Sequence, residues 1–175
     1  FNSISYSDQY STLEGFSDIN LNLIDGKFDS AGVTLNIKNS LSKETVSADI
    51  MLSTPDESAS DFASFLSSLY VDCQLQLMNF SLNRFVTVKN DNNEITMSAY
   101  MTGPVNHPYV TLNIERMSMI IGGLMAKAQG MAFIDDRSVL INDFIFDYQG
   151  MSVKDVSAEF STENLTGYAD APFYA

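Results

Sequence analysis

Apolar and polar residues alternate with a period of two along most of this chain. In residues 95–102 apolar side chains hold the odd positions, and in residues 110–115 they hold the even positions. Because successive side chains of a β-strand point to opposite faces, each segment predicts a strand with one apolar and one polar face. The Gly-Pro and His-Pro pairs within residues 103–108 predict a rigid turn between them, because proline lacks an amide donor and holds the residue before it extended.

The same alternation recurs along the chain and predicts about eleven or twelve short strands. Asp25-Gly26 lies between two alternating segments and predicts a tight hairpin turn. Val153 and Val156 stand at an odd spacing, which a β-bulge would absorb. Further strands are expected at residues 19–23, 33–37, 46–52, 71–77, 80–88, 131–133, 139–148 and 151–160, the last of these being the final strand. Turns or breaks are expected at residues 39–44, 91–93, 122–123, 130, 135–137 and 150, and residues 124–128 fit either a strand or one helical turn.

Residues 58–70 are the one segment with a helical period. Large apolar residues fall at i, i+3, i+4 and i+7 from Phe62 to Leu69. Ser58 followed by Asp61 resembles a capping box in which Asp replaces the usual Glu or Gln. We expect one short amphipathic helix that covers an open end or edge of a sheet. A partner-binding or membrane-binding role for its apolar stripe is the alternative.

Many strands with a single helix predict an all-β fold, mainly antiparallel or mixed, because a parallel sheet needs crossover helices. A sandwich, a barrel or another stacked β architecture fits this pattern. The chain has 175 residues, starts at Phe1 without an initiator methionine, and is long enough for one domain or a slice of a larger protein. We expect residues 1–175 to be a single β-rich segment of a longer protein.

Charge and composition narrow the classes of partner. The chain carries 22 Asp and Glu against nine Lys and Arg, a net charge of −13. Nucleic-acid binding needs a basic footprint, so this balance argues against it, and the same sign disfavours anionic membrane surfaces. Nine Met and twelve Phe, many at strand positions, would fill an ordinary core or serve a surface that accepts variable apolar ligands.

The sequence holds no pattern that indicates an enzyme. His107 is the sole histidine and is expected to be a solvent-exposed turn residue, while Cys73 is the sole cysteine and is expected to be a buried small hydrophobe. These two residues have no supporting spacing for a zinc site, and no serine lies in a nucleophile elbow. Gly122-Gly123 lacks the spacing and basic residues of a phosphate loop. We therefore expect no catalytic residues, no metal and no cofactor.

Residues 98–160 resemble the AsmA-like superfamily, in particular the C-terminal region of TamB-type proteins. Thr102-Gly103-Pro104, followed by Pro108, is similar to that family's repeated glycine, polar spacer and proline before a strand. Alternating strands on both sides of a glycine-marked break at residues 122–123 match as well. The helical segment is similar to short amphipathic helices between strand blocks in that family.

The resemblance implies an elongated, curled sheet, a β-taco, in which one face lines an apolar groove. It implies the periplasmic part of an inner-membrane-anchored envelope protein of diderm bacteria that carries phospholipid between the inner and outer membranes. Within the same family the alternative is assembly of outer-membrane β-barrel proteins with an Omp85-family partner, with exposed edge strands as templates. A closed β-sandwich or solenoid interaction module of an exported protein is the alternative from another class.

Alternate apolar residues of the strands would form the lining of such a groove and contact acyl chains. The sequence does not separate a structural role for these positions from a binding role. The expected lipid-groove residues are Val46, Ala48, Ile50, Val71, Leu75, Leu77, Ile95, Met97, Ala99, Met101, Val110, Leu112, Ile114, Phe144, Phe146 and Tyr148.

Overall fold

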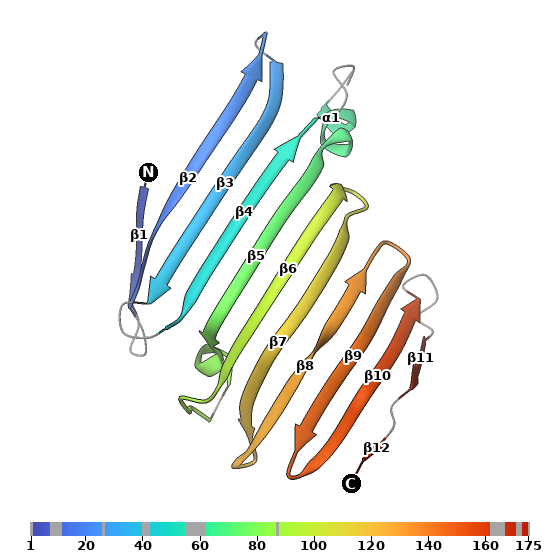
Figure 1. Ribbon diagram of the computed structural model, residues 1–175. Coiled ribbons are helices and arrows are strands. Elements are labelled where there is room, and N and C mark those ends of the chain that lie inside the picture. The colour runs from blue at the N-terminus through green and yellow to red at the C-terminus, as the bar shows by residue number, and fades with distance from the viewer. Residues whose placement is uncertain are drawn as a thin grey trace.

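The computed structural model shows one open, curled sheet of twelve β-strands with a short helix beside it (Figure 1). The structure describes residues 2–7, 12–25, 27–39, 43–54, 62–86, 88–161, 167–170 and 173–174. The first six strands are β1 (Asn2–Ser7), β2 (Thr12–Ile24), β3 (Lys27–Asn39), β4 (Thr45–Ser53), β5 (Tyr70–Ser81) and β6 (Glu94–Pro104). The other six are β7 (Tyr109–Ile121), β8 (Leu124–Ile134), β9 (Ser138–Tyr148), β10 (Met151–Ser161), β11 (Gly167–Asp170) and β12 (Phe173–Tyr174). Helix α1 spans Phe62–Ser68, and a 3-10 helix, η1, spans Leu82–Arg84.

The strands follow one another across the sheet in chain order from β1 to β11, and β12 pairs with β10. Every pair is antiparallel. Most connections are short turns that bring the chain back beside the strand it has just left, which gives antiparallel neighbours. β1 and β11 lie at opposite margins of the sheet (Figure 1), so the sheet does not close on itself. The predicted all-β fold with one short helix is confirmed, and all twelve strands belong to one sheet rather than to two packed layers.

Two hairpin turns show why short polar or glycine pairs separate the strands. Gly122 and Gly123 have φ values of 60° and 86°, and Gln149 and Gly150 have 56° and 79°. Two successive positive φ values define the type I′ turn, whose twist matches that of the flanking strands. The predicted turns at both places are confirmed, and residues 124–128 belong to strand β8 rather than to a helical turn.

Bulges inside the strands shift the alternation by one residue. The predicted irregularity between Val153 and Val156 is confirmed as a register shift between β10 and β9. Similar shifts occur in β5 and β9, and a residue with positive φ lies at each of the three: Asn79, Asp143 and Asp155. Asn and Asp tolerate this conformation better than most side chains, which explains their place inside otherwise apolar alternation.

Gly130 does not end a strand, contrary to the prediction. It lies within β8 at φ 154°, where the register of β8 against β9 shifts. A Cβ atom on Gly130 would lie 2.9 Å from the Cα atom of Phe144, so the two strands approach closely only because this residue has no side chain.

The predicted strand over residues 80–88 is wrong. Phe80 and Ser81 are the end of β5, and η1 and an irregular loop follow them. The Asn83 side chain accepts a hydrogen bond from the Asn90 backbone N–H at 2.9 Å, and the Ser81 side chain accepts one from Asn83. Such local bonds from side chains to the backbone compete with a sheet ladder. The prediction that residues 151–160 form the final strand is also wrong, because β11 and β12 follow β10.

Helix α1 lies at one end of the sheet, between β4 and β5 (Figure 1). It is shorter than the predicted 58–70 segment, because β5 already begins at Tyr70. The proposed cap of Ser58 and Asp61 lies outside the described residues. Phe65 of α1 packs edge-on against Phe28 of β3, with ring centroids 5.5 Å apart. The helix therefore contacts the sheet near the start of β3.

Candidate functional site: an apolar sheet face

The strand register gathers the apolar positions on one face of the sheet. Residues directly opposite each other in an antiparallel pair point to the same face. Leu75 of β5 lies opposite Ala48 of β4 on one side and Ala99 of β6 on the other. The row that contains it runs through Leu35, Ala48, Leu75, Ala99, Leu112, Ala132, Ile141 and Ala158, from β3 to β10. We call the sheet face that carries this row the apolar face.

All the predicted lipid-groove residues are brought together on the apolar face. Val46, Leu77, Met97 and Ile114 form one row across β4 to β7, beside the row of Leu75. On the other side of that row lie Ile50, Met101 and Val110, and Val71 and Ile95 occupy the same face toward the ends of β5 and β6. The three aromatic candidates of β9 lie on this face as well, because Phe144 and Phe146 are opposite Val156 and Val153, and Tyr148 is opposite Met151.

Sequence reasoning missed a second set of residues on the same face. Met117 and Met119 lie opposite Ala128 and Ala126, because a bulge after Ile114 moves the apolar positions of β7 from even to odd numbers. The signal was visible in that change of phase. The small residues of β8 gave a weaker signal, because alanine is apolar without being characteristic of strands.

Exposure differs across the apolar face. Ile19 and Leu21 of β2 are 67% and 62% exposed, while Val71 of β5 is 5% exposed. An interior strand has a neighbour on each side, whereas the outer side of β2 is only partly covered. Val71 and Ile95 on the interior strands are buried, while most other large side chains on the face are half-buried or exposed. Among the described residues α1 contacts the face through Phe28, and Phe85 after η1 stacks on Phe80.

The opposite face is mainly polar over β3 to β7, although it also carries Met51 and Met78. One row across it consists of Asn36, Ser47, Gln76, Ser98 and Asn113. Farther along, toward β9, the same face gains apolar residues: Met131 and Phe133 of β8 and Leu140 and Ile145 of β9. The prediction of one wet face per strand thus describes the first part of the sheet better than the last.

A buried polar cluster joins the loop after η1 to β7. Asn93 is 1% exposed, and its Nδ2 donates to Asn83 Oδ1 at 3.0 Å and to the Val88 carbonyl at 2.7 Å. Its Oδ1 accepts the backbone N–H of Ile120 at 2.8 Å. The Ser118 hydroxyl donates to the carbonyl of the preceding loop residue, Asn92, at 2.6 Å. We call Asn83, Asn90, Asn93 and Ser118 the asparagine cluster.

Glu44 is a buried carboxylate near this loop. Its Oε1 accepts the backbone N–H of Ser81 at 3.1 Å, and its Oε2 accepts the side-chain amide of Asn39 at 2.9 Å. These donors satisfy a buried carboxylate, so Glu44 links the β3–β4 connection to the end of β5. Among the described residues no three His, Cys, Asp or Glu side chains gather in a way that could hold a metal ion.

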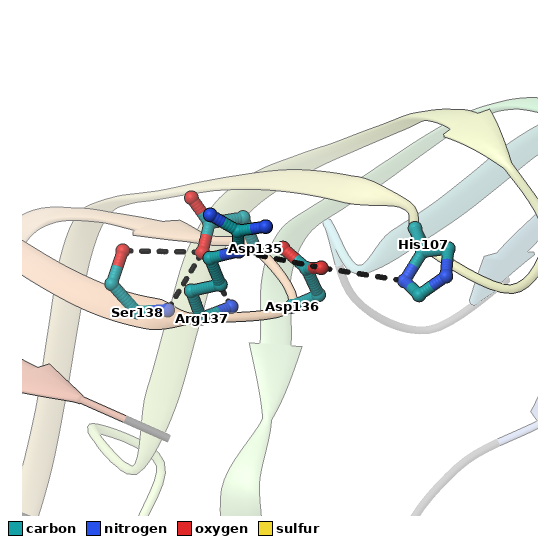
Figure 2. A network of polar contacts seen from close by, with 5 residues as sticks. All are labelled: His107, Asp135, Asp136, Arg137 and Ser138. Carbon is teal, nitrogen blue, oxygen red and sulfur yellow. Dashed lines mark hydrogen bonds and ion pairs between the residues drawn. The ribbon is translucent and has the colours of Figure 1, made fainter. Parts of the chain in front are cut away.

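Figure 2 shows a second polar cluster, where the β6–β7 and β8–β9 turns meet. His107 Nδ1 lies 3.4 Å from Asp136 Oδ2, and the His107 side chain is 60% exposed, which confirms the predicted exposed turn residue. The Asp135 carboxylate accepts the backbone N–H groups of Arg137 and Ser138 at 2.8 Å and 2.6 Å. These two bonds, that of Arg137 first, hold the pKa of Asp135 below its usual value. We call these five residues the His107 cluster.

Cys73 lies on the apolar face, opposite Ile50 and Met101. It is half-buried rather than buried as predicted, because no second layer covers this part of the face in the described structure. Partial burial, together with the adjacent Asp72 carboxylate, raises the pKa of the thiol. The cysteine therefore behaves as a protonated small hydrophobe at neutral pH.

The fold and this face define a class: an all-β protein built on one open, curled antiparallel sheet with one apolar face. No family model, curated protein or solved structure matches the chain. The described part of the chain has no helix of the length and apolarity needed to cross a membrane.

Proposed function

We propose that this chain binds phospholipid acyl chains along its apolar face and helps carry them between the inner and outer membranes. In this proposal it is the periplasmic segment of an inner-membrane-anchored protein similar to the AsmA-like superfamily. The observation that supports it is the unbroken apolar row from Leu35 to Ala158, which crosses eight neighbouring strands, β3 to β10.

The size of the face suits a chain-like apolar ligand. Eleven strands lie side by side from β1 to β11, and at about 4.8 Å apart they give the sheet a width of roughly 50 Å, longer than a compact small-molecule site requires. Each methylene removed from water gains about 0.8 kcal/mol, so an acyl chain of about 16 carbons gains on the order of 13 kcal/mol before ordering costs. Rows of aliphatic side chains offer few polar contacts, so we expect little selectivity among acyl chains.

The opposite face supports the same proposal by its polarity. The row of Asn36, Ser47, Gln76, Ser98 and Asn113 can remain hydrated while the apolar face holds lipid. Large contiguous apolar surfaces on proteins mark binding sites or interfaces. A one-sided sheet thus places lipid on one side and water on the other.

Site-specific photocrosslinking tests the proposal. The photoreactive amino acid p-benzoylphenylalanine replaces Met97 or Leu112 on the apolar face, and in matched controls it replaces the next residue, Ser98 or Asn113, on the opposite face. All four side chains are half-buried, so accessibility does not distinguish them. The protein is incubated with phosphatidylethanolamine vesicles, irradiated and analysed by mass spectrometry.

Phospholipid adducts are expected at Met97 and Leu112 and not at the control positions. Equal labelling of both faces, or no adduct at any position together with no phospholipid in solvent extracts of the purified protein, contradicts the proposal.

The second candidate role, assembly of outer-membrane barrel proteins with an Omp85-family partner, is favoured by a different feature. Part of the outer edge of β2 has no neighbouring strand in the described structure, and such edges accept added strands. In that case a probe at Leu21 of β2 would crosslink to polypeptide from envelope extract rather than to phospholipid.

A further inference from the structure

We propose that the outer edge of β2 pairs with β2 of a second copy of this chain, across a two-fold axis at Leu21. The proposal concerns a sheet edge and does not rest on lipid binding. Two copies joined in this way would form one larger sheet whose apolar faces lie on the same side.

The first observation is an unpaired stretch of strand. β1 pairs with β2 only from Thr12 to Ser17, so residues 18–24 have a partner strand on the β3 side alone within the described chain (Figure 1). Outward backbone N–H and C=O groups of such a stretch are a template for another strand. Ile19, Leu21 and Leu23 carry exposed side chains here, on the apolar face.

The opposite margin of the sheet is protected against pairing with another strand, and this contrast identifies β2 as the edge available for association. The outer side of β10 is covered by β11 over residues 157–160 and by β12 over residues 152–153. Lys154 and Asp155 lie in the bulged stretch between them, and both are exposed. Charges, bulges and short covering strands are the devices that block edge pairing. Residues 18–24 contain one charged residue, Asp18, and no lysine or proline.

The sequence of the free edge is complementary to itself. In an antiparallel pair centred on Leu21, Ile19 of each copy lies opposite Leu23 of the other, and Asn20 lies opposite Asn22. Asp18 then lies opposite Ile24, so no two carboxylates are directly opposed across the strands. In this register the numbers of two opposed residues are both odd or both even, so the apolar faces of the two copies lie on one side of the joint sheet. A shift by one residue would place Leu21 opposite an asparagine and turn one copy over.

The large negative charge sets a condition for the pairing. Each copy carries a net charge of −13, so the two copies repel each other over distances that salt screens. Association should therefore be stronger at 0.5 M than at 0.05 M salt.

Sedimentation equilibrium of the whole chain tests the association. A mass of twice 19.3 kDa is expected at 0.5 M salt. Leu21→Lys should return it to the monomer mass, because two lysines would then lie directly opposite each other. Met151→Lys is the matched control, because Met151 is 60% exposed on the same face near the other margin, against 62% for Leu21, and it should remain dimeric.

A disulfide trap tests the register. In a Cys73→Ala background, Leu21→Cys places two thiols opposite each other at the two-fold axis, whereas Leu23→Cys places its thiol opposite Ile19. Oxidation with diamide should crosslink the Leu21→Cys protein at least tenfold more than the Leu23→Cys protein. A monomer at every concentration overturns the proposal, as does equal loss of dimer in the two lysine variants or equal crosslinking in the two cysteine variants.

Discussion

The asparagine cluster and the His107 cluster hold loops at the two ends of the sheet in different ways. Asn93 is buried and uses its whole amide to bind three partners, one each from η1, the loop after it and β7. His107 and Asp136 meet at the surface, where water and salt screen their interaction. The comparison shows that a count of polar contacts at each end would mislead, because the free-energy cost of losing a contact depends on whether the partners left behind are buried.

Replacing Asn93 with alanine should have the largest effect. The substitution leaves the Ile120 N–H and the Val88 carbonyl without their partner, and we expect the free energy of unfolding to fall by about 3 kcal/mol. Urea denaturation followed by circular dichroism measures this change. Asn92→Ala is the matched control, because Asn92 is exposed and takes part in the asparagine cluster through its backbone. This variant should change stability by less than about 0.5 kcal/mol. Equal effects of the two variants would contradict the idea that burial of the side-chain partners sets the free-energy cost at this end of the sheet.

Replacing Gly103 with alanine should have an intermediate effect at the end of the sheet that carries the His107 cluster. Gly103 has a φ of 120°, and a Cβ atom would lie 3.4 Å from the Tyr109 ring, so backbone strain matters more than crowding. We expect a loss of about 1 to 2 kcal/mol, measured by the same denaturation. Asn106→Ala in the exposed turn is the control and should be near neutral. A neutral Gly103→Ala would mean that the turn relaxes without affecting the strands.

Replacing Asp135 with asparagine should have the smallest effect, seen mainly as a change in pH dependence. The pKa of Asp135 is lowered in the folded protein, so its stabilising effect is complete above the unfolded value of about 3.9 and is lost as the pH falls through the folded value. The urea midpoint of the wild type should therefore fall more between pH 5 and pH 3 than that of the variant. Asp136→Asn removes the same charge but keeps both backbone bonds to Asp135. If the two variants have the same pH profile, net charge rather than hydrogen bonding governs the acid response.

The sequence predicted the apolar face well, because alternation is a direct consequence of strand geometry. Val46, Leu77 and Met97 needed only a period of two and an antiparallel register to reach the same face. The Val153 bulge was predictable as well, because odd spacing between apolar residues has no other simple explanation in a strand.

The parts that the sequence did not predict depend on contacts between distant residues or on side-chain bonds to the backbone. Residues 82–86 and 88–93 leave the sheet because Asn83 and Asn93 bind loop backbone, which the apolar pattern of Phe85 and Val88 does not reveal. Gly130 resembles a turn residue until Phe144 is placed beside it. The stretch of β2 that has no outer partner strand among the described residues could not be predicted either, since it depends on where β1 stops pairing.

The bulge in β7 shows that the number of residues in a strand, and not only their chemistry, decides which side chains lie on the apolar face. Between Ile114 and Met117 β7 uses one residue more than either neighbouring strand, so the residues before and after the bulge follow different parities. Deleting Glu115 would retain every apolar residue of the strand. It would also leave Ile114 and Met117 two residues apart, so a β7 without the bulge would keep Met117, Met119 and Ile121 on the apolar face. Loss of this one residue would therefore restore the period of two, whereas the same loss in a regular stretch of strand would turn the following side chains to the other face.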